Sequence, residues 1–214
     1  MRDSFHGELS RLRAELGEMC AFSGQAMRHA TMALLTADLV LAEQVLSGDA
    51  QLDAWRAECE EQAQVLLALQ APVASELRLL VAVVYCADDI ERMGDLAAHI
   101  AGMVRFRHPH HVVAGPLETK FRLLGILTAG MAAKVADLIV APAEGVFAQL
   151  EDTDRAVDDL HRGILDYLTS PAWPDDHAAA ACAALLSRFY ERFGDHAVSV
   201  ARRFEFAVSG TLPV

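Results

Sequence analysis

A seven-residue motif occurs twice in this chain, and the repetition limits the folds that the chain can adopt. Residues 91–97 read ERMGDLA and residues 191–197 read ERFGDHA, so Glu, Arg, Gly, Asp and Ala recur at an offset of 100. A second pattern precedes each copy, with DAQLD at residues 49–53 and DRAVD at residues 154–158. Two matched patterns in the same order predict an internal duplication, in which both halves of the chain fold as the same unit.

The spacing of apolar residues predicts helix along nearly the whole first half. From Phe5 to Ala33 the apolar positions step mostly by threes and fours, which is the spacing of an amphipathic helix in a bundle. Asp49 follows Ser47 and Gly48 and is interpreted as the start of a second helix that ends at Gln70. A third helix is expected from Val73 to Phe106, after the break at Pro72.

The second half repeats this pattern. Apolar residues from Phe121 to Leu138 again step by threes and fours. A helix is expected to start at Asp154, the sequence SPAWP at residues 170–174 ends it, and a final helix is expected from about Asp175. Pro142 is expected to shorten or kink the helix that precedes it. No alternating pattern typical of β-strands competes with this interpretation.

The clearest interruption in the chain lies between the two halves. It consists of HPHH at residues 108–111 and the pair Gly115 and Pro116. We therefore expect an all-α fold of two tandem three-helix bundles, six long antiparallel helices in total. The first bundle spans residues 1–107, the linker residues 108–116, and the second bundle residues 117–214. The histidine run is interpreted as a solvated linker rather than a metal-binding tract.

Composition excludes several classes of protein. Eighteen Lys and Arg against thirty Asp and Glu give a net charge of −12 over 214 residues, which repels nucleic-acid backbones. The uncharged run Leu79–Ala87 is about half as long as a bilayer span, and no apolar signal follows the first residue. We expect a cytoplasmic protein that binds no nucleic acid. The four cysteines form no CxxC pair and are interpreted as reduced core thiols: Cys20, Cys59, Cys86 and Cys182.

The acidic residues of the repeated patterns are candidates for metal binding. Carboxylates four residues apart lie on one helix face, about one turn (~6 Å) apart, and repel each other unless a cation compensates them. Asp53 and Asp49 lie 18 and 22 residues before a turn near Ala71, and Glu91 and Asp95 lie 20 and 24 residues after it. The two acidic pairs therefore lie at similar heights on adjacent helices. Oxygen ligands favour hard cations such as Mg, Ca, Mn or iron. The four residues of this first cluster are Asp49, Asp53, Glu91 and Asp95.

A second cluster is expected in the other half, although its acidic pairs lie at unequal distances from the turn, so a longer loop must absorb the difference. Its residues are Asp154, Asp158, Glu191 and Asp195. His99 extends the first acidic stripe by one turn, but Ser199 stands at the repeated position, so histidine is not part of the repeated set.

A simpler interpretation stays open for each of these features. The acidic faces can be solvent-exposed surfaces on which Arg92 and Arg192 form weak ion pairs. Trp55 and Trp173 are expected to pack in the core or at turns. The same packing role, against a neighbouring helix or a second subunit, is expected of the aromatic side chains beside the second motif: Phe189, Tyr190 and Phe193.

Several segments together resemble the PhoU family of phosphate-signalling regulators. They are the duplicated ERxGD helices, each preceded by a DxxxD helix, and the stretches FHGELSRLRAELGEMC at 5–20, LALQAPVASELRLLVAVV at 67–84 and CADDIERMGDLAAHIA at 86–101. The resemblance covers nearly the whole chain. It implies two tandem three-helix bundles whose eight acidic residues bind metal ions or clusters, with iron, zinc, Mg, Mn or Ca as candidates. Gly94 and Gly194 also match, and a glycine within a helix indicates a close approach by another group.

The resemblance also implies a function that the residues alone do not. It implies a cytoplasmic adaptor that regulates phosphate uptake, is peripherally associated with membrane complexes, and represses the phosphate-starvation response when phosphate is plentiful. The implied partners are the ATPase subunit of the phosphate ABC transporter and a phosphate-sensing histidine kinase. The implied state is a homodimer without enzymatic activity.

Two other hypotheses remain. One is a metal-dependent hydrolase, which needs a general base and a closed pocket beside the metal. The other is a structural bundle whose acidic stripes keep it in solution. A ferritin-like di-iron site is excluded, because the chain contains no Glu-xx-His sequence. The position before each motif also differs between the halves, with Asp88 and Asp89 in the first and Arg188 and Phe189 in the second, so the two sites need not hold the same metal.

Overall fold

The chain folds as six long helices in a computed structural model that describes residues 2–70, 72–113, 115–174 and 177–212. No strand occurs among these residues, which confirms the all-α prediction. The helices are α1 (Arg2–Thr36), α2 (Leu39–Gln70), α3 (Ser75–Arg107), α4 (Pro116–Val140), α5 (Val146–Leu168) and α6 (His177–Ser209). The predicted start of the last helix, near Asp175, lies outside the described residues.

Two of the predicted helix starts are wrong. α2 begins ten residues before Asp49, at Leu39, because the Oδ1 atom of Asp38 accepts the backbone N–H of Leu41 at 3.0 Å and caps the helix there. Gly48 does not break α2 but lies against the ring of Phe22, where an added β-carbon would be 3.1 Å from Cζ. Both acidic residues of the first pattern therefore lie in the middle of α2.

α5 likewise begins at Val146 and not at Asp154. α4 ends at Val140, before Pro142, and the chain then turns through Gly145 at φ 78°. The backbone N–H of Phe147 donates to Glu205 Oε1 at 2.8 Å, which satisfies a free donor in the first turn of α5.

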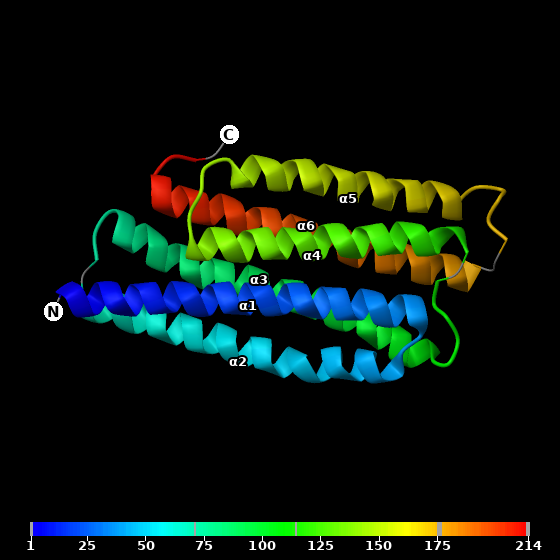
Figure 1. Ribbon diagram of the computed structural model, residues 1–214, viewed down its shortest axis with the longest axis horizontal. Coiled ribbons are helices and arrows are strands. Elements are labelled where there is room, and N and C mark those ends of the chain that lie inside the picture. The colour runs from blue at the N-terminus through cyan, green and yellow to red at the C-terminus, as the bar shows by residue number, and fades with distance from the viewer. Residues whose placement is uncertain (1, 71, 114, 175–176, 213–214) are drawn as a thin grey trace.

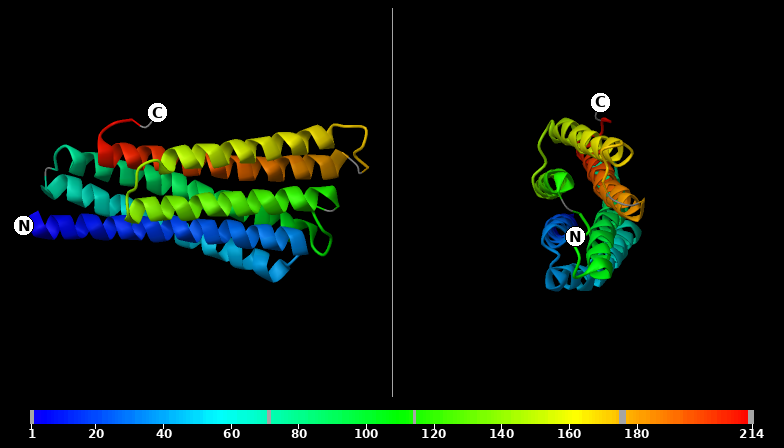
Figure 2. Two further views of the ribbon diagram at one scale, coloured as in Figure 1. Left: turned by 45° about the horizontal axis from the view of Figure 1, so that its top comes forward. Right: turned by 90° about the vertical axis from the view of Figure 1, so that its right-hand side faces the viewer.

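The six helices form two layers (Figure 1). α1 and α4 lie side by side in front, α3 and α6 lie side by side behind them, and α2 and α5 lie at the outer edges (Figure 2). α1 packs on α4 and α3 packs on α6 as extensively as helices pack within one half. The chain leaves α3 at Arg107 and enters α4 at Pro116.

The contacts between the halves give the two three-helix units a common core. One continuous cluster of buried apolar side chains includes members from all six helices. Tyr190, Phe121 and Phe193 are among its largest fully buried members, and the hydroxyl groups of Tyr190 and Thr31 lie 3.0 Å apart. Burial of this size, rather than helix propensity, stabilises the bundle.

All four cysteines are free, and the prediction of buried core thiols is correct for Cys20, Cys59 and Cys86 but not for Cys182, which is only partly buried. Burial raises the pKa of Cys20 to about 12. Trp55 packs edge-on against Phe22 with ring centroids 5.3 Å apart, and Trp173 packs against Tyr167 at 5.6 Å.

α4 contains a longer apolar stretch than the run at residues 79–87. Among the described residues it is the one helix whose length and composition would suffice to cross a membrane. More than half of its most apolar stretch is buried inside the bundle.

Two candidate metal-binding clusters

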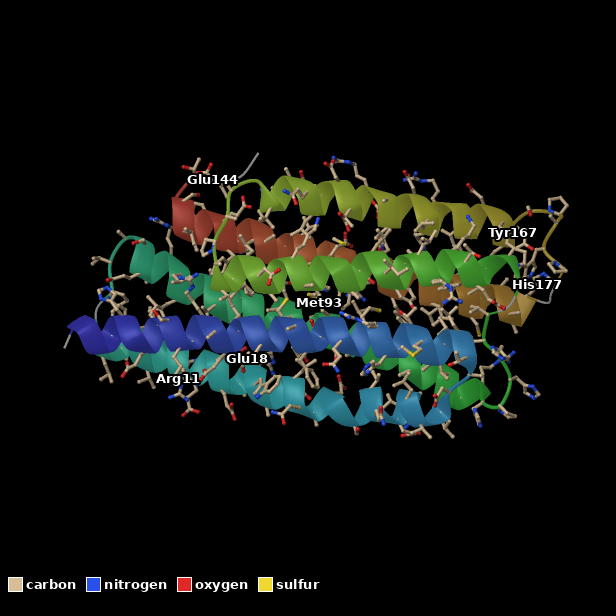
Figure 3. All side chains as sticks on the ribbon, in the orientation of Figure 1. Arg11, Glu18, Met93, Glu144, Tyr167 and His177 are labelled. Carbon is tan, nitrogen blue, oxygen red and sulfur yellow. The ribbon has the colours of Figure 1, made fainter. Side chains whose placement is uncertain are left out.

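The first acidic cluster lies where α2 crosses α3, near the middle of the molecule. Met93, within the first motif, is labelled near the middle of Figure 3, between the ribbons of α1 and α4 in that view. A β-carbon added to Gly94 would overlap the Cδ1 atom of Leu52, which is only 1% exposed. The glycine thus allows α2 and α3 to approach closely, and that approach brings Asp49 toward Asp95.

The carboxylates of the first cluster act on one another across the two helices. Burial raises the pKa of Asp49, and the charges of Asp95 and Asp53 raise it further. The pKa of Glu91 rises to about 7, first through burial and then through the charge of Asp95, while Arg92 opposes the shift. A side-chain hydrogen bond with Asp53 also favours the protonated form of Glu91.

The second cluster lies where α5 crosses α6, and there the glycine faces an acid directly. A β-carbon added to Gly194 would overlap the Oδ1 atom of Asp154. The side chain of Asp154 therefore lies against the backbone of the second motif. The unequal distances from the turn do not separate the two acidic pairs, since the charges of Asp195 and Glu191 both act on Asp154.

Repulsion between neighbouring carboxylates also raises pKa values in the second cluster. The pKa of Asp154 rises to about 7, through burial first and then through the charges of Asp158, Asp195 and Glu191. Burial also raises the pKa of Glu191, and Asp195 adds to that shift. The pKa of Asp195 rises through burial, with Arg188 opposing the shift.

Each cluster contains an arginine, but the two arginines come from different positions of the repeat. In the first cluster, Arg92 lies 3.7 Å from Glu91 Oε2 and 3.4 Å from Asp95 Oδ2. In the second, Arg188 forms the ion pair with Glu191. The expected pairing of Arg192 with a neighbouring acid does not occur within the described residues. The surface ion pairs of the simpler interpretation are thus present in part. The charge of Arg56 also acts on Glu91 and that of Arg192 on Asp195, but the arginines near each cluster are still fewer than its four carboxylates.

Three carboxylate oxygens in the clusters are buried and accept no hydrogen bond: Glu91 Oε2, Asp154 Oδ1 and Glu191 Oε2. A buried acceptor without a donor is costly, and a cation would satisfy it. The chemistry of the donor set therefore fits a hard cation. Nowhere in the described chain, however, do three His, Cys, Asp or Glu side chains already have the arrangement of a metal site. Metal binding stays a prediction, and it requires side-chain rotation around backbones that are already in place.

His99 lies at the edge of the first cluster. Its charge lowers the pKa of Asp49, although burial of Asp49 outweighs this effect. Its ring stacks on Phe189 of the other half, with centroids 5.2 Å apart and the planes inclined by 27°. Phe189 thus packs against a neighbouring helix, as predicted.

A polar contact between the halves was missed by the sequence reasoning. Asp89 Oδ1 accepts a hydrogen bond from His196 Nδ1 at 2.9 Å, and its Oδ2 atom accepts one from Ser199 Oγ at 2.9 Å. Arg203 Nε lies 3.5 Å from the same carboxylate. The replacement of Asp89 by Phe189 in the second half was the available signal, but it did not identify a partner on α6.

Comparison with known proteins places these features in a family context. Residues 16–104 and 121–204 each match the PhoU domain. A Mycobacterium tuberculosis protein named phosphate-specific transport system accessory protein PhoU homolog 2 is 45% identical over 213 residues, covering 100% of both chains. A Mycobacterium leprae protein named PhoU homolog 1 of the same system is 43% identical, covering 100% of this chain and 96% of the relative.

Solved structures with the same fold exist. PhoU from Pseudomonas aeruginosa is 25% identical and superimposes with a TM-score of 0.85, covering 97% of this chain and 100% of that one. The phosphate transport system regulatory protein PhoU from Streptococcus pneumoniae has a TM-score of 0.88 at 21% identity, covering 98% and 99% of the two chains. The similarity to the Streptococcus pneumoniae structure, at 21% identity, supports the fold alone.

Proposed function

Because the chain belongs to the PhoU family, we propose that it is an accessory protein that regulates phosphate transport. The observation that carries this proposal is the full-length similarity, at 45% identity, to a relative whose name assigns it to the phosphate-specific transport system. The family model matches residues 16–104 and 121–204, which contain both copies of the acidic motif of this chain, so the regulatory unit would be the whole bundle.

The finer proposal concerns partners and location. We propose that the protein works in the cytoplasm, peripherally at the membrane, by contacting the ATPase subunit of the phosphate ABC transporter and a phosphate-sensing histidine kinase. Its effect would be to repress the phosphate-starvation response at high phosphate. A rigid bundle with long exposed helix faces suits such contacts, because little backbone movement is needed to bind on each face.

We further propose that each acidic cluster holds one or more metal cations. Asp49, Asp53, Glu91 and Asp95 would hold one site, and Asp154, Asp158, Glu191 and Asp195 the other. Bound cations would neutralise the repulsion between carboxylates and tie α2 to α3 and α5 to α6. Support comes from the unsatisfied buried oxygens and from the raised pKa values of Glu91 and Asp154. Mg, Mn, Ca, iron and zinc are the candidate metals.

A pull-down with the purified ATPase subunit and kinase tests the partner proposal. The wild type should retain both partners, and Glu91→Ala with Asp95→Ala should weaken at least one of them. Glu58→Ala with Glu61→Ala is the matched control, since it removes two exposed acids of α2 away from the clusters. Retention of both partners by the cluster variant would show that the first cluster does not serve partner binding.

The alternatives predict different measurements. A metal-dependent hydrolase would release phosphate from a generic phosphoester such as p-nitrophenyl phosphate when metal is added, whereas the adaptor would not. A structural bundle would show no change in melting temperature with any divalent or ferric ion. Sedimentation analysis and a nucleic-acid mobility shift check the predicted homodimer and the predicted lack of nucleic-acid binding.

A further inference from the structure

An apolar groove runs between α1 and α4, on the layer that lies in front in Figure 1. It has a volume of about 530 Å³, within the range of ligand and peptide sites. The groove lies away from both acidic clusters, which α2, α3, α5 and α6 carry. The residues of this α1–α4 groove are Arg28, Thr31, Met32, Leu35 and Thr36 of α1, and Arg122, Gly125, Ile126, Ala129, Gly130 and Ala133 of α4.

Two large apolar side chains in the groove are exposed to solvent. Met32 is 50% exposed and Ile126 is 62% exposed. Met32 and Leu35 are three residues apart on α1, while Ile126, Ala129 and Ala133 follow one another at three and four residues on α4. Each wall thus offers a stripe at helical spacing, which is the form that a third helix recognises when it lies in a groove.

Small residues keep the groove open and allow α1 and α4 to approach each other closely at its floor. A β-carbon added to Gly125 would overlap Thr31, so α1 and α4 are in direct contact at the floor. A β-carbon added to Gly130 would meet nothing within 4 Å, so the space above this residue is empty. Two helices in close contact beneath an open apolar space leave room for the ridge of a partner helix.

The charge at the groove indicates the chemistry of the occupant. Arg28 and Arg122 are exposed at the groove, one on each wall, and neither forms an ion pair with another described residue. The chain as a whole carries a net charge of −12, so this positive border departs from its surroundings. In a symmetric contact between two copies, the same positive border would face itself, which disfavours a second copy of this chain.

We propose that the α1–α4 groove binds an amphipathic helix of a partner protein, with acidic residues on both flanks of its apolar stripe. Residues 122–133 span about 16 Å of α4, so about three turns of the partner helix would be in contact. This inference rests on the proposed function in one respect, that the chain acts by contact with other proteins. It requires no metal at either cluster.

The test uses purified full-length protein and labelled helical peptides of about 14 residues. The first peptide carries leucines at helical spacing with glutamates on both flanks. The second replaces these glutamates by lysines, and the third shuffles the first so that the apolar stripe is lost. Fluorescence anisotropy should show that the first binds about tenfold more tightly than either of the others.

Two variants with matched controls locate the binding. Ile126→Glu should weaken binding of the acidic peptide about tenfold or more, while Leu185→Glu, which changes an exposed leucine of α6, should not. Arg122→Glu should weaken the acidic peptide and strengthen the lysine peptide, while Lys134→Glu on the same helix should change neither. Circular dichroism of each variant confirms that the fold is intact, and exposure of all four side chains favours this outcome.

Several outcomes would overturn the proposal. Equal binding of the acidic and lysine peptides, or no binding of either, would remove it. Sedimentation of a wild-type dimer that Ile126→Glu dissociates would assign the groove to a second copy instead. Binding to phosphatidylglycerol vesicles that Ile126→Glu abolishes would assign it to an anionic lipid surface.

Failure of the groove inference and failure of the proposed function can be told apart. If a deletion strain carrying the wild-type gene does not recover regulation of phosphate uptake, the proposed function fails regardless of the peptides. If regulation is recovered while no peptide binds, only the groove inference fails.

Discussion

The Nδ1 atom of His196 lies 2.9 Å from the Oδ1 atom of Asp89, and this hydrogen bond joins the two repeats at the crossing of α3 and α6. Leu96 is the counterpart of His196 in the repeat, and Phe189 is the counterpart of Asp89. Phe189 stacks on His99. The duplication has therefore produced one polar and one aromatic contact at the same helix crossing. The polar contact gives the joined halves a defined pairing that apolar packing alone would specify less strictly.

Asp89→Ala should destabilise the protein by about 2–3 kcal/mol, because it leaves His196 and Ser199 in a partly buried interface without their acceptor. Asp88→Ala, at the exposed neighbouring acid, should cost less than about 0.5 kcal/mol. Urea denaturation of the two variants checks this difference. Equal stability of the two would mean that the α3–α6 contact is maintained by packing alone.

Acid should weaken the same contact. Burial by itself would raise the pKa of Asp89, but hydrogen bonds from His196 and Ser199 lower it overall. A carboxyl with a lowered pKa in the folded state stabilises the fold above its unfolded pKa of about 3.9, and this contribution is lost as pH falls through the folded value. The stability difference between wild type and Asp89→Asn should therefore shrink below about pH 4, as denaturation at several pH values will show. A constant difference down to about pH 2 would show that ionisation of Asp89 does not stabilise the fold.

The glycine of the first motif should resist replacement. Gly94→Ala should destabilise the protein by about 1–2 kcal/mol, since overlap with Leu52 outweighs the gain in helix propensity. Gly102→Ala on the same helix should instead stabilise it by about 0.5–1 kcal/mol, because no atom lies within 4 Å of the added carbon. Thermal denaturation compares the two variants. A stabilising Gly94→Ala would show that α2 can withdraw from α3 without cost.

The clusters should make the metal-free protein less stable as pH rises. The folded-state pKa of Glu91 is raised to about 7, so its protonated form is favoured by folding and stability falls between the unfolded value, near 4.3, and about pH 7. Glu91→Gln should remove this dependence and be more stable than wild type at pH 8 by about 1 kcal/mol, since water screens part of the repulsion. Denaturation in the presence of a chelator tests this. The opposite result would be that raising the pH from 5 to 8 stabilises the wild type more than it stabilises Glu91→Gln.

A bound cation should reverse that effect. At a concentration about 100 times its dissociation constant, a cation adds about 2.7 kcal/mol per site, and it should do so most strongly at pH 8, where the carboxylates are ionised. Asp49→Asn with Glu91→Gln should lose only the contribution of the first site, and Asp154→Asn with Glu191→Gln only that of the second. Calorimetric melting with Mn²⁺ measures each contribution.

The sequence predicted the helical class because it depends on local spacing, and the same spacing indicated which helix faces carry the acidic residues. Five residues recurring at an offset of 100 mark equivalent turns of α3 and α6. The start of α2 was placed at Asp49 because an acidic residue after Ser47 and Gly48 resembles a cap, and the start of α5 was placed at Asp154. Asp38 provides the actual cap of α2, and Gly48 serves packing against Phe22.

The contacts between the halves could not be predicted in this way. The repeat describes one three-helix unit and contains no information on how two such units meet. The bond from His196 to Asp89 joins residues 107 positions apart, and the α1–α4 groove depends on which small residues of the two helices face each other. The arginine of the second cluster was assigned to position 192, whereas Arg188 reaches Glu191 from the preceding turn.

If the duplicated motifs form two metal sites, anomalous X-ray scattering from crystals grown with Mn²⁺ should show peaks within about 2.6 Å of carboxylate oxygens in both clusters. One set of peaks should lie beside Glu91 and Asp95 and the other beside Glu191 and Asp195. Well-ordered crystals with no peak near any of the eight acids would rule out both sites.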